Sequence, residues 1–257
     1  TLQSIGGGGG VVANVGGNLS LGGTLGSALS ASGGSLDYTG YNNLIATNGS
    51  DSPALVLQSI GGGGGLVGSA AGSLSVGTTT VSGSISNGAS ITALNRAQLS
   101  TIGNNSAAVV LQSIGGGGGL IASQPNGVTI GSNGAGVSRS GDLNLTTLKA
   151  IQTQGINSPG VILQSIGGGG ALVTANGGAI ALGGSPQGNS NSGSITYSSQ
   201  STIGTGGSRN TSSNTNSNAN TNELIDPEQS RNSPAVIAQS IAGGGGYVGS
   251  TAGASAG

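Results

Sequence analysis

Short stretches in which apolar and polar residues alternate recur along this chain. One set has Leu, Val or Ile at every second position between Gly or Asn residues, at 17–22, 72–77, 126–131 and 178–183. A second set follows each of these, at 34–38, 89–94, 141–145 and 193–197. Alternation over four to six residues between turn-forming residues is typical of half-buried β-strands. No segment has a helical pattern, so the chain is predicted to be all-β.

The segments 54–60, 108–114 and 160–166 follow a different pattern. Each begins with four residues that show no alternation and are almost all apolar, and each ends in Gln-Ser-Ile. A strand that is apolar on both sides is expected to be covered on both faces. One face is predicted to line the core, and the other meets the glycines that follow, a neighbouring sheet or another molecule. In the last case its residues would be an assembly face, comprising Val56, Val110, Ile162 and Ile237.

Each of these segments, and its counterparts near the two ends of the chain, leads into four or five glycines. The runs lie at 6–10, 61–65, 115–119, 167–170 and 243–246. Each Gly costs about 0.5–1 kcal/mol relative to Ala in regular structure, but it also lets another backbone approach closely. We predict that the runs are ordered and that their backbone groups are hydrogen-bonded. Flexible linkers are the alternative, but they would not explain why Gln-Ser-Ile stays in phase with every run.

The glutamine of the motif marks an internal repeat. Gln3, Gln58, Gln112, Gln164 and Gln239 lie 55, 54, 52 and 75 residues apart. Stacked strand units of this kind form β-solenoids, and a right-handed β-helix is the expected form. We divide the single array, 1–257, into units at about 2–56, 57–110, 111–162 and 163–237 and a partial unit at 238–257.

Each unit is predicted to hold about five short strands. Turn-forming clusters rich in Asn, Ser and Pro precede the motif, at 48–56, 103–110, 155–162 and 231–237. One unit could form two coils, three coils or one large coil. The fourth unit is longer because of a polar, low-complexity insertion at 204–231, which we interpret as a loop.

The motif residues are expected to form rows along the stack. Stacked glutamines can form amide ladders, which suits Gln58, Gln112 and Gln164. The full set of predicted motif residues is Gln58, Ser59, Ile60, Gln112, Ser113, Ile114, Gln164, Ser165 and Ile166.

The composition argues against an enzyme. The chain has 57 Gly, no His and no Cys, and 4% charged residues, against about 25% in an average domain. It therefore lacks a thiol nucleophile, an imidazole base and the usual zinc ligands. The one group of nearby carboxylates, Glu223, Asp226 and Glu228, lies in the insertion. No glycine run continues as a P-loop or as a calcium-binding repeat. We expect no catalytic residues, no metal and no cofactor.

Charge and hydropathy limit the partners. The net charge of −1 gives no electrostatic reason for nucleic-acid binding. No stretch reaches the 18 or more apolar residues of a membrane span. The first and last residues lie inside repeats, so we interpret the chain as part of a longer protein.

The combined motif Ser-Pro-Ala-Val-Val-Leu-Gln-Ser-Ile followed by glycines resembles the glycine-rich repeats of large bacterial autotransporter and adhesin-like surface proteins. This resemblance implies export, a β-helical passenger and a role in adhesion, biofilms or surface layers. We therefore expect a structural, self-associating protein that is secreted or lies on the bacterial cell surface. Its expected partners are itself and a host or abiotic surface. The alternative is a ligand-binding solenoid that recognises glycans or another surface.

Overall fold

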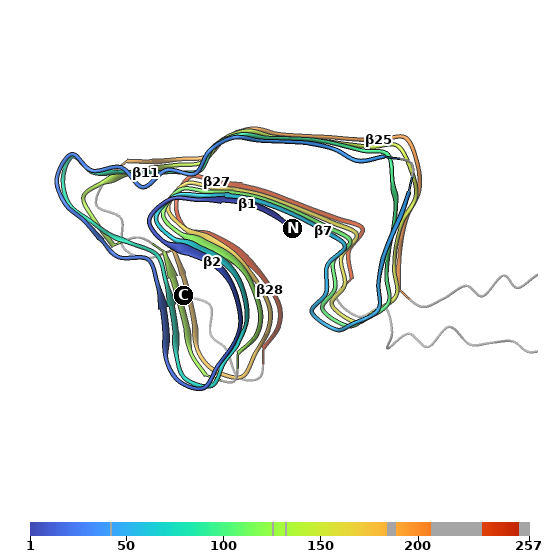
Figure 1. Ribbon diagram of the computed structural model, residues 1–257, viewed down its shortest axis with the longest axis horizontal. Helices are drawn as coiled ribbons and strands as arrows, with labels where there is room; N and C mark the ends of the chain where they lie inside the picture. The colour runs from blue at the N-terminus through green and yellow to red at the C-terminus, as the bar shows by residue number, and fades with distance from the viewer. Residues whose placement is uncertain (42, 125, 132, 184–188, 207–232, 252–257) are drawn as a thin grey trace, which may run out of the picture.

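The chain winds into a β-solenoid in which each repeat unit forms one large coil (Figure 1). The computed structural model describes residues 1–257 except 42, 125, 132, 184–188, 207–232 and 252–257. Within the described residues there is no helix. The pairing of Leu57 with both Leu2 and Leu111 is typical, since strands pair in parallel with those of the neighbouring coils. The prediction of an all-β fold of stacked strands is confirmed.

In the part of the chain that the structure describes, seven parallel sheets run along the stack, and we number them in the order in which they occur along the chain. The motif sheet contains β1 (Leu2–Ile5), β7 (Leu55–Ile60), β14 (Val109–Ile114), β21 (Val161–Ile166) and β27 (Val236–Ile241). The second sheet contains β2 (Gly9–Val15), β8 (Gly64–Ala70), β15 (Gly118–Gln124), β22 (Gly170–Asn176) and β28 (Gly245–Thr251). The third sheet contains β3 (Leu19–Leu21), β9 (Leu74–Val76), β16 (Val128–Gly131) and β23 (Ile180–Gly183).

The remaining four sheets complete each coil. The fourth contains β4 (Thr24–Leu25), β10 (Thr79–Thr80) and β17 (Asn133–Gly134), and the fifth contains β11 (Ile85–Asn87), β18 (Val137–Arg139) and β24 (Ser190–Asn191). The sixth contains β5 (Leu36–Thr39), β12 (Ile91–Asn95), β19 (Leu143–Thr147) and β25 (Ile195–Ser199). The seventh contains β6 (Leu44–Thr47), β13 (Gln98–Thr101), β20 (Ile151–Thr153) and β26 (Ile203–Thr205).

The alternating stretches of the sequence form the third and sixth sheets, as predicted. The prediction of about five strands per unit is too low, because the second and third coils each contain seven, β7–β13 and β14–β20. Strands of two residues, such as β10, are too short to show alternation. The insertion predicted at 204–231 begins at the end of β26, and from 207 onward it lies outside the described residues.

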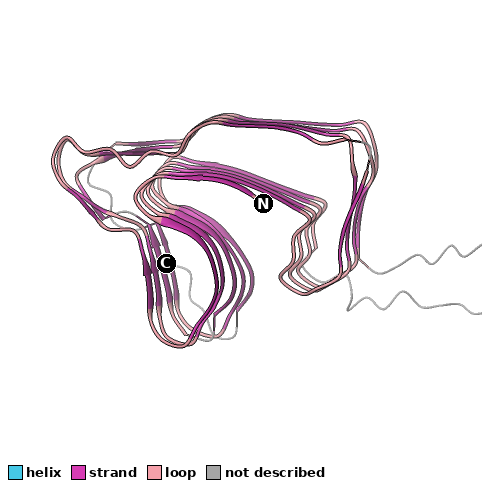
Figure 2. Cartoon of the chain, viewed as in Figure 1, coloured by secondary structure: helices cyan, strands magenta, loops and turns pink. Residues whose placement is uncertain are grey.

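The motif sheet lies between two other layers of the coil (Figure 2). One face packs on the sixth and seventh sheets, where Leu57 and Leu111 meet Ile91, Leu143 and Leu99 in the main core. The opposite face packs on the second sheet. The second sheet in turn places Val67 and Ile121 on the third sheet in a second core. Each fully buried Leu or Ile contributes about 1.5–3 kcal/mol, so the stack of large side chains supplies much of the stability.

The glycine runs are the sharp turns between the motif sheet and the second sheet. Gly62 and Gly63 have φ of 73° and 98°, a region that favours glycine. Their amides bond between coils: Gly118 N donates to Gly63 O and Gly170 N donates to Gly117 O, both at 3.1 Å. The prediction of ordered, hydrogen-bonded runs is thus confirmed within the described residues.

Close backbone contact explains why these turns have no side chains. A Cβ on Gly117 would lie 2.5 Å from the Cα of Gly77, and a Cβ on Gly169 would lie 2.6 Å from the Cα of Gly131. The glycine turns and the glycines that end the third sheet are therefore in direct contact. We call this contact the neck of the coil, and it lies beside the turn from β1 to β2 in Figure 1. Any larger residue would push the third sheet away from the turn.

The Asn-Ser-Pro clusters form the turns that precede the motif strands. Asp51, Asn105 and Asn157 occupy equivalent positions with φ of 55°, 56° and 52°, a left-handed conformation that Asn and Asp tolerate well. The serine that follows links successive turns: Ser106 N donates to the hydroxyl of Ser158 at 3.1 Å. The turn chemistry predicted from the sequence is confirmed.

In the tip of the coil, residues 78–87 in the second coil, polar side chains face inward and apolar ones face outward, which is the reverse of the arrangement in the two aliphatic cores. Thr78, Thr80, Ser84 and Ser86 are buried there, whereas Ile85 is 41% exposed. The tip lies at the left of Figure 1, where the fourth sheet turns into the fifth. Its interior is lined with hydroxyl groups instead of aliphatic side chains.

Candidate functional site

The motif glutamines form the amide ladder that their spacing predicts. Gln58 Nε2 donates to Gln112 Oε1 at 2.6 Å, and Gln112 Nε2 donates to Gln164 Oε1 at 2.7 Å. The same Nε2 of Gln112 also donates to the carbonyl of Gly119 at 3.1 Å. All three amides are buried. The ladder therefore ties each coil to the next and each motif strand to the strand after its glycine turn.

The motif serines connect the motif sheet to the loop before the sixth sheet. Ser113 Oγ donates to Ala89 O at 2.9 Å and accepts from Gly141 N at 2.7 Å. Ser59 and Ser165 repeat the arrangement, since each donates to a carbonyl of that loop. One hydroxyl thus bridges two successive coils, and its role is structural.

The motif isoleucines cover the glycine turns from within. Ile60, Ile114 and Ile166 are fully buried. The Cδ1 of Ile166 lies 2.7 Å from the point at which Gly170 would carry a Cβ. In β7, β14 and β21 the Gln, Ser and Ile of the motif are therefore fully buried, and each serves a separate packing role.

The prediction of an assembly face is wrong. Val56, Val110 and Ile162 are buried against Leu120 and Leu172 of the second sheet. Ile237, in the last motif strand, packs against the same cluster and is half-buried. The chain covers this face itself because the glycine turn folds the second sheet back beneath the motif sheet. The sequence pattern indicated two covered faces but did not specify what covers the second.

The charged groups in the described residues do not cluster. No group of three or more His, Cys, Asp or Glu lies within metal-binding range in the part of the chain that the structure describes. The exposed carboxylate of Asp142 accepts hydrogen bonds from the backbone N and Oγ of Ser194 at 2.7 and 2.9 Å. These two hydrogen bonds lower the pKa of Asp142, and they serve to join successive coils.

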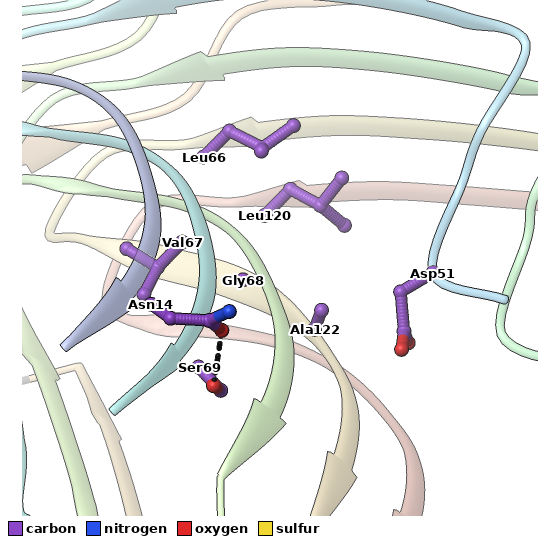
Figure 3. Close-up of a pocket in the computed structure, with 8 residues that line it drawn as sticks. All are labelled: Asn14, Asp51, Leu66, Val67, Gly68, Ser69, Leu120 and Ala122. Atoms are coloured by element: carbon purple, nitrogen blue, oxygen red, sulfur yellow. Dashed lines mark hydrogen bonds between the residues drawn. The ribbon is translucent and has the colours of Figure 1, made fainter. Parts of the chain in front are cut away.

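A cavity of about 230 Å³ opens where the second sheet faces the turn before β7. Leu66, Leu120 and Ala122 form its apolar floor (Figure 3). Asp51 borders it from the opposite loop (Figure 3). Thr174 Oγ1 donates to Asp51 Oδ1 at 3.2 Å across the gap. We call this cavity the inter-sheet groove. It was not predicted from the sequence, because Asp51 and Thr174 lie 123 positions apart.

A second groove lies at the outer corner between the third and fourth sheets and has a volume of about 240 Å³. Only small residues line it, and they repeat from coil to coil: Ser20, Gly22, Gly23, Thr24, Ser75, Gly77, Thr78, Thr79, Thr129 and Gly131. We call it the hydroxyl groove. Three of its glycines, Gly22, Gly77 and Gly131, are those that meet the glycine turns from the other side.

Comparisons with known proteins do not assign a function to either groove. None of the described elements is a helix that could cross a membrane. No model of a known protein family, no curated protein and no solved structure significantly matches this chain.

Proposed function

We propose that this chain is a structural, self-associating extracellular protein, such as an adhesin passenger, a surface fibre or a component of a biofilm or surface layer. The observation that carries the proposal is the uninterrupted row of motif residues, in which Gln3, Gln58, Gln112, Gln164 and Gln239 bond in sequence across the five strands of the motif sheet. The motif residues serve coil stacking, which is what an extended scaffold requires. The proposal assigns the chain no enzymatic activity and no cofactor.

The localisation and the finer architecture belong to the same proposal. The resemblance of its motif to the repeats of bacterial surface proteins supports secretion or display at a bacterial cell surface. A right-handed β-helix is the proposed handedness, because connections between parallel strands are right-handed in about 98% of cases. No nucleic-acid partner is proposed.

Self-association would use outward faces of the coil, since Val110 and Ile162 are covered. The outer surface of the sixth sheet carries Asp37, Thr92, Asn144 and Thr196, which repeat from coil to coil and are exposed. A surface that repeats with the strand spacing of about 4.8 Å is suited to contact another copy with the same repeat.

Electron microscopy of the purified chain tests this proposal. Filaments or sheets that grow with protein concentration are the expected result. Monodisperse short rods at every concentration would contradict it.

The alternative is a ligand-binding solenoid that recognises glycans, and the hydroxyl groove favours it. Ser20, Ser75 and Thr129 form a polar row along that groove, and hydroxyl groups can both donate and accept hydrogen bonds. A glycan-array screen distinguishes the two: saturable binding that is lost in Ser75→Val, with no filaments, would favour the alternative.

A further inference from the structure

The inter-sheet groove combines an apolar floor with one carboxylate. Leu66 and Leu120 belong to neighbouring strands β8 and β15 and extend toward the opposite loop (Figure 3). Two coils further along the stack, Leu172 and Thr174 are buried. The groove is therefore open at the level of β8 and covered at the level of β22.

Asp51 departs from the pattern of its own row. Asn105 and Asn157 occupy the equivalent positions in the next two turns, with nearly the same φ. The left-handed conformation thus needs only a short side chain with a carbonyl-type oxygen, and Asn supplies it. The negative charge at Asp51 is consequently not explained by the turn.

The carboxylate of Asp51 has capacity for a further partner. Thr174 Oγ1 lies 3.2 Å from Oδ1 and shares its single proton between this oxygen and Ala122 O, which lies at 2.8 Å, whereas an ionised carboxylate can accept about four hydrogen bonds. Among the described residues no Lys or Arg forms an ion pair with it. Of the described residues that line the groove, it is the one that carries a charge, and Asn14, Ser69 and the apolar floor lie beside it.

The geometry points to a binding site for a small aliphatic ammonium ion. Its cationic nitrogen would donate to the free acceptor positions of Asp51, and its apolar stem would lie on Leu66 and Leu120. The volume of about 230 Å³ is below the 300–1,000 Å³ of drug-sized pockets and limits the ligand to a short chain. This site is independent of the proposed self-association.

NMR titration of the full chain with n-pentylammonium tests the proposal, with n-pentanol as the neutral probe of the same length. The methyl resonances of Leu66 and Leu120 are expected to shift with both probes. The ammonium ion is expected to bind about ten-fold more tightly than the alcohol, because hydrogen bonds to a charged group are the stronger ones. The preference is expected to shrink as salt is added.

Asp51→Asn is the matching variant, and it should fold because Asn already occupies this position in two other turns. It is expected to abolish the preference for the ammonium ion while leaving pentanol binding unchanged. Asp37→Asn removes the same charge from the exposed face of the sixth sheet and is expected to leave the preference intact. Equal binding of the two probes, an equal loss in both variants, or no methyl shift at millimolar probe would each overturn the proposal.

Discussion

The main core and the tip of the coil use the same strand-and-turn construction with opposite polarity. In the main core Leu57, Leu111 and Leu163 face inward and are fully buried. In the tip the inward residues are hydroxyl-bearing, and Val81 and Ile85 face outward with 36% and 41% of their surface exposed. Successive side chains of a strand point to opposite faces, so a shift of one residue would exchange the inward and outward residues. The positions of apolar and hydroxyl residues in the sequence therefore determine which kind of side chain faces inward in each region.

The difference shows that a large coil need not be stabilised equally around its perimeter. The main core gains free energy from apolar burial. The tip is held by backbone pairing and by hydroxyl groups that bond to carbonyls, such as Ser86 Oγ to Gly115 O at 2.6 Å and Ser84 Oγ to Val81 O at 2.7 Å. The stability of the tip is therefore expected to depend on the glycine turn, to which Ser86 is hydrogen-bonded.

The largest expected effect separates the two regions directly. Leu111→Ala removes a fully buried side chain and is expected to lower the free energy of unfolding by about 2–5 kcal/mol. Ile85→Ala in the tip is expected to lower it by only about 1 kcal/mol, because 41% of this residue is already exposed and only a fully buried side chain contributes the full amount of about 1.5–3 kcal/mol. Urea denaturation of both variants measures the contrast. Similar losses would mean that the tip is as closely packed as the core.

The next effect concerns the neck between the two regions. Gly117 has a φ of 103°, and its added Cβ would meet Gly77. Gly117→Ala is therefore expected to cost about 1–3 kcal/mol from backbone strain alone. Gly16→Ala, at a position with open space around it, serves as the control and is expected to be neutral or slightly stabilising. Amide exchange should accelerate in the tip of Gly117→Ala; unchanged exchange would contradict the dependence of the tip on the neck.

The glutamine ladder is expected to have an effect of about the same size or smaller. Gln112→Leu removes the hydrogen bonds from Gln112 Nε2 to Gly119 O and to Gln164 Oε1, and the one that Gln112 Oε1 accepts from Gln58. A buried polar group that loses its partner costs about 1–3 kcal/mol. Gln3→Leu affects a half-buried residue with one neighbour in the ladder, so its thermal unfolding should shift less. An equal shift for both variants would show that burial of the ladder contributes little.

The smallest effect is expected for a hydroxyl inside the tip. Thr78 Oγ1 is buried and has no hydrogen-bond partner among the described residues, so Thr78→Val is expected to leave stability unchanged or raise it by up to about 1 kcal/mol. Thr101→Val removes a bond of 2.6 Å to Ser106 O and is expected to cost about 1 kcal/mol. If calorimetry gave the same loss for both, Thr78 would have to have a partner.

The repeated parts of the fold could be predicted from the sequence because the cause of each lies within one unit. Alternation predicts the third and sixth sheets, and the spacing of Gln58 and Gln112 predicts their ladder. The packing of Gly117 on Gly77 follows from the general property of glycine, although the partner could not be named. In each of these cases the same signal occurs several times.

What could not be predicted depends on the path of the coil. Leu120 and Leu172 cover Val110. The direction of the glycine turn determines that this cover comes from the same chain and not from another molecule. The inter-sheet groove joins Asp51 to a strand three motifs later. No local pattern brings these residues together, and the one available signal was the replacement of Asn by Asp in the turn row.

The central claim, that one repeat unit makes one coil in register, is tested most directly by cysteine cross-linking. The chain has no Cys, and Thr92 and Asn144 are exposed register partners in β12 and β19. Adjacent strands lie about 4.8 Å apart, within the Cα separation that a disulfide allows. The account predicts rapid oxidation of Thr92→Cys with Asn144→Cys, and no disulfide for Thr92→Cys with Thr196→Cys, which lie two strands apart. Failure of the first pair, or equal cross-linking of both, would contradict it.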